Sequence, residues 1–193
     1  MGQAGLHYIG LLALVVAALG NTVEAQPLKP PYSSEQALRN AAFDGQSESV
    51  RSILDKGAKP DARDSDGRTA LMTASFNGHM ETVRLLLERG SKVGHQDRFG
   101  RTALMYAASG PYPETVRLLL DNGADVNRPD TEEGFTALMF AAAEGQSGVI
   151  QVLLAHGADT KVTDKDGDTA LDFAKKNGHQ DAIEELKKAS GGK

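Results

Sequence analysis

The chain has 193 residues, a formal net charge of −5, few aromatic residues and no cysteine. Such a composition fits one modest, mildly acidic domain, and it excludes a scaffold held together by disulfides. A chain with excess negative charge is also a poor candidate for binding nucleic acid.

The N-terminal residues differ from everything that follows them. An apolar run, Tyr8–Gly20, is far too short to span a membrane as a helix and is typical of the core of a signal peptide. Small residues at Val23 and Ala25 offer a cleavage site, so residues 1–25 are predicted to be a signal peptide. Because no Lys or Arg precedes the apolar run, an uncleaved membrane anchor and a cytoplasmic start stay open as alternatives.

A short linker and the first helix come next. Residues 26–32 hold three of the seven prolines of the chain and are predicted to form an extended, Pro-rich linker. Ser33, with Gln36 three residues later, has the pattern of a capping box and predicts the start of a helix.

From residue 33 onward the sequence repeats itself. The tripeptide Thr-Ala-Leu begins at Thr69, Thr102, Thr136 and Thr169, at separations of 33, 34 and 33 residues. A second landmark, the glycine after each apolar run, recurs with the same rhythm at Gly57, Gly90, Gly123 and Gly157. Two independent landmarks with one period indicate a repeat array.

Each unit reads as two helices and a loop. Thr69 can cap a helix that ends near Gly78, where glycine tolerates a left-handed conformation. The segment Met80–Arg89 places apolar residues on one helical stripe, and the polar stretch from Gly90 to Gly100 reads as a hairpin-like loop. Since a single pair of helices cannot bury its apolar faces alone, the units must stack.

These landmarks resemble the ankyrin repeat family over Asp64–Asp166, including Gly78-His79, Leu86-Leu87 and the run Gly123–Asn127. The resemblance implies an all-α solenoid of about five units. One departure is consistent, because Met replaces the family's histidine in the first helix of three units. The loss of His removes a polar tie between loop and helix, and apolar packing of Met is expected to replace it, with an effect on the geometry of the loop.

The register divides the chain into a repeat domain over residues 33–190 and a disordered tail over residues 191–193. Polar residues replace apolar ones on the outer helix at Ser52 in the first unit and at Glu185 and Lys187 in the last, so both ends are predicted to be caps. The repeats are expected at residues 33–63, 64–96, 97–129, 130–163 and 164–190.

The sequence shows no pattern typical of a catalytic or metal-binding site. Neither a nucleophile with a base nor a metal-binding spacing is visible, so we expect no enzyme activity, no cofactor and no metal. His79 and His179 occupy the family's Gly-His position and are expected to be structural. The run Asp164–Asp168 hints at a calcium loop, but its glycine comes early and no Glu closes it, so a hairpin is the simpler interpretation.

Binding is the function that the resemblance implies. In ankyrin-like stacks the hairpin tips and the exposed side of the first helices form a concave face that contacts partner proteins. Transferring these positions gives Arg68, Phe76, Arg98, Phe99, Arg101, Glu132, Phe135 and Glu144. Tyr112, flanked by two prolines, is a candidate at a second edge, and a stiffened turn is its alternative.

Alternatives remain for the aromatic residues. Phe43 and Phe76 could pack between neighbouring helices and extend the core, and this alternative applies with less force to the tip residues Phe99 and Phe135. The three arginines precede acidic residues in the next repeat, so a partner of complementary polarity would dock in one register.

The sequence therefore predicts a monomeric module that binds a protein. An export signal on an ankyrin-like chain points to a bacterial periplasm, and resemblance to exported bacterial ankyrin proteins implies support of a catalase and of oxidative-stress defence. An immunity-like inhibitor of a periplasmic toxin or enzyme and a scaffold anchored in the inner membrane are the alternatives.

Overall fold

The computed structural model describes residues 33–191. The predicted signal peptide (1–25), the predicted linker (26–32) and the last two residues of the predicted tail lie outside the described residues.

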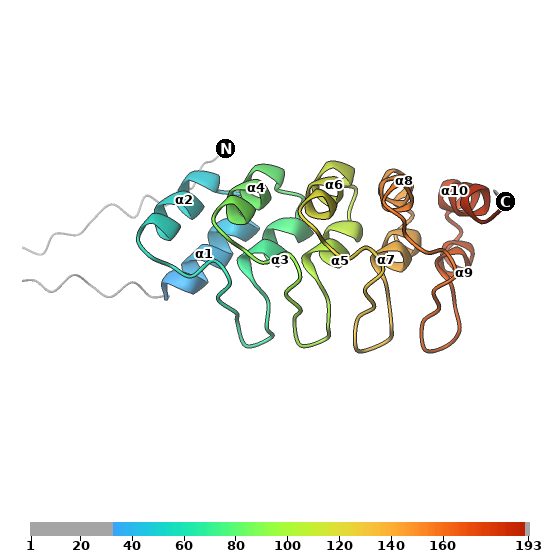
Figure 1. Ribbon diagram of the computed structural model, residues 1–193, viewed down its shortest axis with the longest axis horizontal. Coiled ribbons are helices and arrows are strands. Elements are labelled where there is room, and N and C mark those ends of the chain that lie inside the picture. Colours follow the sequence, from blue (N-terminus) through green and yellow to red (C-terminus); the bar gives the residue numbers. More distant parts are fainter. Residues whose placement is uncertain (1–32, 192–193) are drawn as a thin grey trace, which may run out of the picture. The chain divides into compact units, whose positions relative to one another are not determined.

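Ten α-helices form the described part of the chain, arranged as five antiparallel pairs in two layers (Figure 1). The inner helices, next to the hairpin loops, are α1 (Ser34–Phe43), α3 (Ala70–Phe76), α5 (Ala103–Ala108), α7 (Ala137–Ala143) and α9 (Ala170–Lys176). The outer helices are α2 (Ser47–Asp55), α4 (Met80–Glu88), α6 (Pro113–Asp121), α8 (Ser147–Ala155) and α10 (Gln180–Gly191). The predicted all-α solenoid of five units is confirmed.

A threonine starts each inner helix from α3 to α9. In α3 the Thr69 hydroxyl accepts a hydrogen bond from the backbone N–H of Met72 (3.4 Å), while Met72 Sδ accepts from the N–H of Thr69 (3.5 Å). This reciprocal pattern is a capping box in which a thioether replaces the usual Glu or Gln. In α9 the carboxylate of Asp172 takes the same role. Met therefore supplies a weak acceptor, whereas the sequence predicted only apolar packing from it.

Glycines end the helices as predicted. Gly78 follows α3 with φ 68°, and Gly123 follows α6 with φ 85°. Residues with a Cβ rarely adopt this left-handed region, so the position of each helix end is fixed by sequence.

One continuous apolar core lies between the two layers. Every inner helix contributes small and aliphatic residues, such as Ala70, Leu71 and Met72 of α3, and the outer helices contribute residues such as Val83 and Leu86 of α4. Small residues let neighbouring inner helices approach closely, which is how each repeat covers the apolar face of the next.

The ends of the array carry polar residues where the middle carries apolar ones. Leu85 of α4 is 3% exposed, while Ser52 in the equivalent position of α2 is exposed to solvent, as is Lys187 of α10. One boundary differs from the prediction. Helix α10 includes Gly191, one residue past the expected end of the domain, and in its last turn the Ser190 hydroxyl donates to the carbonyl of Leu186. Among residues 33–191, no helix is both long and apolar enough to cross a membrane.

Candidate protein-binding surface

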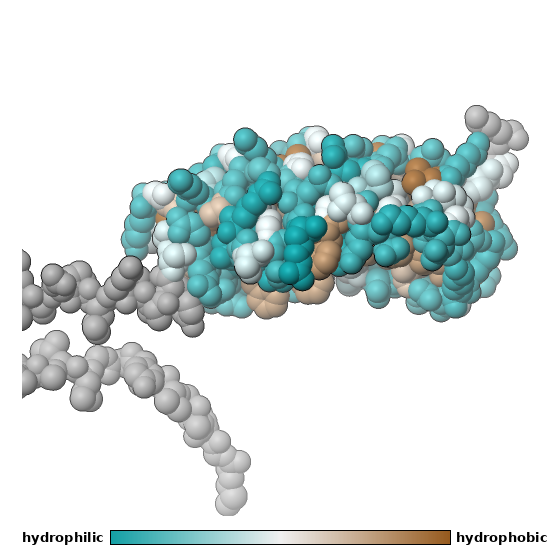
Figure 2. Space-filling model, turned by 90° about the horizontal axis from the view of Figure 1, so that it is seen from below, coloured by the Kyte–Doolittle hydropathy of each residue, from teal (hydrophilic) through white to brown (hydrophobic). Residues whose placement is uncertain are grey.

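The hairpin tips and the exposed side of the inner helices form one surface, which we call the inner-helix face. Seen from the side of the tips, it is mainly hydrophilic, with hydrophobic residues showing at a few places along the row (Figure 2). The predicted candidates, apart from Tyr112, lie on the elements that build this face.

An aspartate shapes each hairpin. Asp97 Oδ1 accepts hydrogen bonds from the backbone N–H groups of Phe99 and Arg101 at 2.9 Å, and Asp64, Asp130 and Asp164 do the same in the other hairpins. Asp97, Asp130 and Asp164 are buried, with at most 9% of each residue exposed to solvent. The run Asp164–Asp168 is therefore a hairpin of the same kind as the others, as predicted.

The backbone also joins each tip to the next. Between neighbouring hairpins, an N–H of the later one donates to a carbonyl of the earlier one. These hydrogen bonds run from Arg98 to Asp66 (2.8 Å), from Thr131 to Phe99 (2.9 Å) and from Lys165 to Glu133 (2.9 Å). The spacing between the four tips is thus set by main-chain hydrogen bonds, while the aspartate of each hairpin sets the shape of its own loop.

The arginines Arg68 and Arg98 of the first and second hairpins are paired within the protein. Arg68 Nε lies 2.9 Å from Asp64 Oδ2, and Arg98 Nη1 lies 2.7 Å from Asp66 Oδ1. Burial acts to raise the pKa of Asp64, but hydrogen bonds from Arg68 and from the backbone outweigh it and hold that pKa below its usual value. The basic stretch expected from the sequence is therefore largely neutralised by neighbouring carboxylates.

Arg101 occupies the centre of the face. Its guanidinium carbon lies 5.2 Å from the centre of the Phe99 ring and 5.6 Å from that of Phe140, and its Nη2 lies 3.5 Å from Glu132. Arg101 Nε is 3.8 Å from the fully buried carboxylate of Asp130, too far for a hydrogen bond. Aromatic faces and carboxylates on several sides hold this guanidinium in one place.

Aromatic rings follow the row of inner helices. Phe76 meets Tyr106 edge to face at 6.2 Å, and Phe135 meets Phe140 at 5.7 Å and Phe173 at 5.0 Å. Phe135 packs against the core, whereas Phe76 is 48% exposed. The structure reverses the expected order of exposure, because Phe135 has aromatic neighbours on two inner helices.

Tyr106 is held by its hydroxyl, which donates to Asp97 Oδ2 at 2.7 Å. Burial raises the pKa of Tyr106 well above its usual value, and the bond to Asp97 raises it further. The ring cannot turn away from this position without breaking its hydrogen bond to Asp97.

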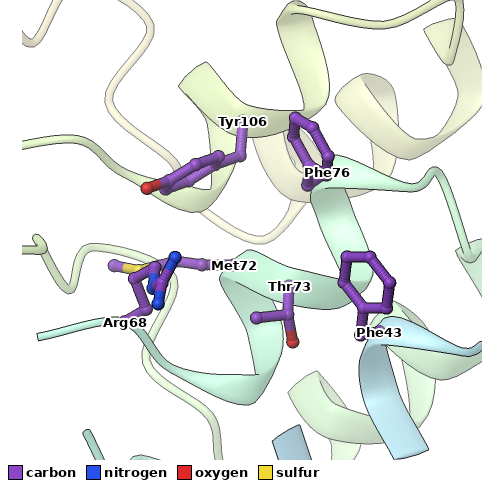
Figure 3. Close-up of a pocket in the computed structure, with 6 residues that line it drawn as sticks. All are labelled: Phe43, Arg68, Met72, Thr73, Phe76 and Tyr106. Carbon is purple, nitrogen blue, oxygen red and sulfur yellow. The ribbon is translucent and has the colours of Figure 1, made fainter. Parts of the chain in front are cut away.

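A pocket of about 170 Å³ opens on the inner-helix face at α3. It is lined by Phe43, Arg68, Met72, Thr73, Phe76 and Tyr106. Phe43 and Phe76 stand on one side of it, and Tyr106 and Arg68 stand on the other (Figure 3). Sequence reasoning missed this pocket, although the signal was present: position 73 is a threonine where the next three repeats carry Tyr106, Phe140 and Phe173.

Most of the predicted residues come together. Contacts link Arg98, Phe99, Arg101 and Glu132 to one another, and Phe76 shares the pocket with Arg68. Two candidates stand apart. Glu144 is exposed at the end of α7, and the Tyr112 ring packs so closely over Gly78 and Gly110 that a Cβ on either glycine would overlap it.

Histidines occupy the position of Tyr112 in two other repeats, and each contacts the repeat before it. His79 Nε2 lies 2.9 Å from the carbonyl oxygen of Phe43, and His179 Nε2 lies 2.9 Å from that of Ala143. Both side chains bridge one repeat to its predecessor, as the prediction of a structural role requires. Among residues 33–191, no group of three or more His, Cys, Asp or Glu side chains could hold a metal ion.

Comparison with known proteins agrees with this architecture. A family model described as ankyrin repeats (3 copies) matches residues 38–130, and a model described as ankyrin repeats (many copies) matches residues 128–174. None of the curated proteins matches the chain. Ankyrin repeats indicate a protein–protein interaction module. On the evidence of both matches and of its five stacked helix pairs, the chain belongs to the ankyrin repeat family.

Proposed function

We propose that this protein is a non-enzymatic module that captures a partner protein through the inner-helix face. The observation that supports it best is the exposure of two large rings, Phe43 (49%) and Phe76 (48%), on a surface with fixed tips. Exposed aromatic side chains that lie beside polar groups are common anchors of protein interfaces.

The setting of this interaction is part of the proposal. The protein acts as a monomer in the periplasm, and this location rests on the apolar run and the cleavage pattern of residues 1–25. Support of a periplasmic catalase, and with it of oxidative-stress defence, is the first role to test.

A site-specific cross-linking experiment tests the proposed surface. The photoreactive amino acid p-benzoylphenylalanine replaces Phe76 or Glu144 on the inner-helix face, and Arg51 or Glu184 on the outer helices as matched exposed controls. Irradiation of intact native cells should give a discrete cross-linked product from the first pair only, and mass spectrometry identifies the partner. A catalase would support the antioxidant role, whereas a toxin would favour an inhibitor. Products from the outer-helix positions alone would contradict the proposed surface.

A further inference from the structure

Repeat two lacks a ring that the later repeats possess. Thr73 lies four residues after the helix-capping Thr69, and in the next three repeats this position is Tyr106, Phe140 and Phe173. Helices α5, α7 and α9 thus fill the space beside their hairpins with a ring of their own. In α3 the same space is left open and forms the pocket.

The two rings at the rim come from another position of the repeat. Phe43 and Phe76 are the last residues of α1 and α3, where the later repeats carry small or charged side chains. They are about half exposed; Phe43 lies across the opening from Tyr106, and Phe76 meets the Tyr106 ring edge to face at 6.2 Å (Figure 3). The apolar walls are therefore formed by three successive inner helices.

The polar side chains around the pocket already have partners. The Tyr106 hydroxyl donates to Asp97, Thr73 Oγ1 donates to the carbonyl of Ala70 at 2.9 Å, and Arg68 is paired with Asp64 and Asp66. Because Phe43, Met72, Phe76 and the Tyr106 ring form most of the wall, a charged or polar group entering the pocket would lose hydration that the wall replaces only in part. The chemistry of the walls selects an apolar occupant.

We propose that this pocket receives one phenylalanine side chain of the partner protein, which takes the place of the ring missing at Thr73. This inference rests on the proposed function and specifies the partner's anchor. A cavity of roughly 150 Å³ lined by apolar side chains holds benzene, so a pocket of about 170 Å³ has the size for one phenyl ring. Rings already meet edge to face here, and an added ring can do the same.

Charge gives the partner segment a second feature. Glu144 caps the C-terminal end of α7, two inner helices beyond α3, and its exposed carboxylate takes part in no ion pair within residues 33–191. Neighbouring helices pack about 8–10 Å apart, which places Glu144 roughly 16–20 Å from the pocket. An extended chain advances about 3.3 Å per residue. A Lys or Arg five or six residues from the phenylalanine of the partner segment would reach this carboxylate.

Selection from random twelve-residue peptides displayed on phage tests this inference on the purified full chain. The enriched peptides should share a Phe, and those that also contact Glu144 should carry a Lys or Arg five or six residues away. Thr73→Phe closes the pocket with the ring that neighbouring repeats already accommodate, and it should weaken the best peptide about tenfold or more in a fluorescence-polarisation titration. Replacing the peptide's own Phe by Ala should have the same effect, with little further loss when both changes are combined. Arg51→Ala, on an outer helix, should change nothing.

Other outcomes separate the two proposals. If enriched peptides bind Thr73→Phe normally but lose affinity for Arg101→Ala, the pocket proposal is wrong and the inner-helix face remains the binding surface. If no variant of this face alters affinity, both proposals fail. Failure to enrich any peptide contradicts the pocket proposal alone, because cross-linking still reports on the face. Phe76→Ser, which removes one wall, provides a second variant in case Thr73→Phe does not fold.

Discussion

Phe135 and Phe76 lie on the same surface but contribute differently to stability. Phe135 contacts the rings of Phe140 and Phe173, whereas nearly half of Phe76 is exposed. We expect Phe135→Ala to lower the free energy of unfolding by about 2 kcal/mol, below the 3–5 kcal/mol typical of a fully buried ring. Phe76→Ala should cost less than about 1 kcal/mol. Urea unfolding followed by circular dichroism measures both, and equal losses would contradict the packing described for Phe135.

A second residue-scale prediction concerns Asp172, the acid that caps α9. Hydrogen bonds from Thr169 lower its pKa to about 2, from an ordinary value of 3.8. A carboxylate with a lowered pKa in the folded state stabilises the protein above about pH 4, and this contribution is lost as the pH falls toward 2. Since the side chain is 37% exposed, solvent screening reduces the gain to about 1 kcal/mol or less.

Comparison of the wild type with Asp172→Asn isolates this effect. The variant should be less stable at pH 7, and the difference in unfolding free energy should shrink steadily between pH 4 and pH 2.5. A difference that did not change with pH would show that the charge of Asp172 is irrelevant to the cap.

At the scale of the helices, glycine substitutions distinguish backbone strain from crowding. Gly123, after α6, has φ 85° and open space around a hypothetical Cβ, so Gly123→Ala should cost about 1 kcal/mol through the backbone alone. At Gly78 the added Cβ would also overlap the Tyr112 ring, and Gly78→Ala should cost clearly more.

A double-mutant cycle tests whether Tyr112 sets the spacing between repeats two and three. Gly78→Ala combined with Tyr112→Ala should be less destabilising than the sum of the two single changes, by about 1 kcal/mol, because the overlap disappears. Thermal or urea unfolding gives the four values. Additive losses would mean that the ring can move aside, and would leave Tyr112 free to contact a partner.

The molecule as a whole behaves as a row of units in which each stabilises its neighbours. A chain that ends at residue 163 loses the fifth repeat and exposes the outer side of α8. If Leu154→Lys transfers the polar residue found at Lys187, the shortened array should remain folded. Its urea m-value should fall by about a fifth, because less surface is exposed on unfolding. A shortened chain that is unfolded in buffer would show that the fifth repeat is indispensable.

The sequence predicted this architecture well because repetition multiplies each local signal. Thr69 and its three counterparts mark the helix starts, and glycines such as Gly78 mark the ends, so both structural elements and their order follow from pattern alone. Neighbouring helices must pack because each is apolar on one side, and this requires no further information.

The candidate site was harder to predict, because exposure depends on contacts between repeats. The sequence cannot show that Phe135 finds rings on two inner helices, or that the carboxylates of Asp64 and Asp66 neutralise Arg68. The pocket was missed for a related reason. It exists because Thr73 is smaller than its counterparts, and an absence is visible only when the repeats are aligned position by position.

The hydrogen bonds between successive tips, such as Thr131 N–H to the carbonyl of Phe99, involve only the main chain. A mutation that replaces an exposed tip side chain, and spares the hairpin aspartate and glycine, therefore alters what the protein recognises while leaving the scaffold in register. Natural variation can exchange one partner for another at these positions at little risk to folding, and a designer who wishes to redirect this protein can begin there.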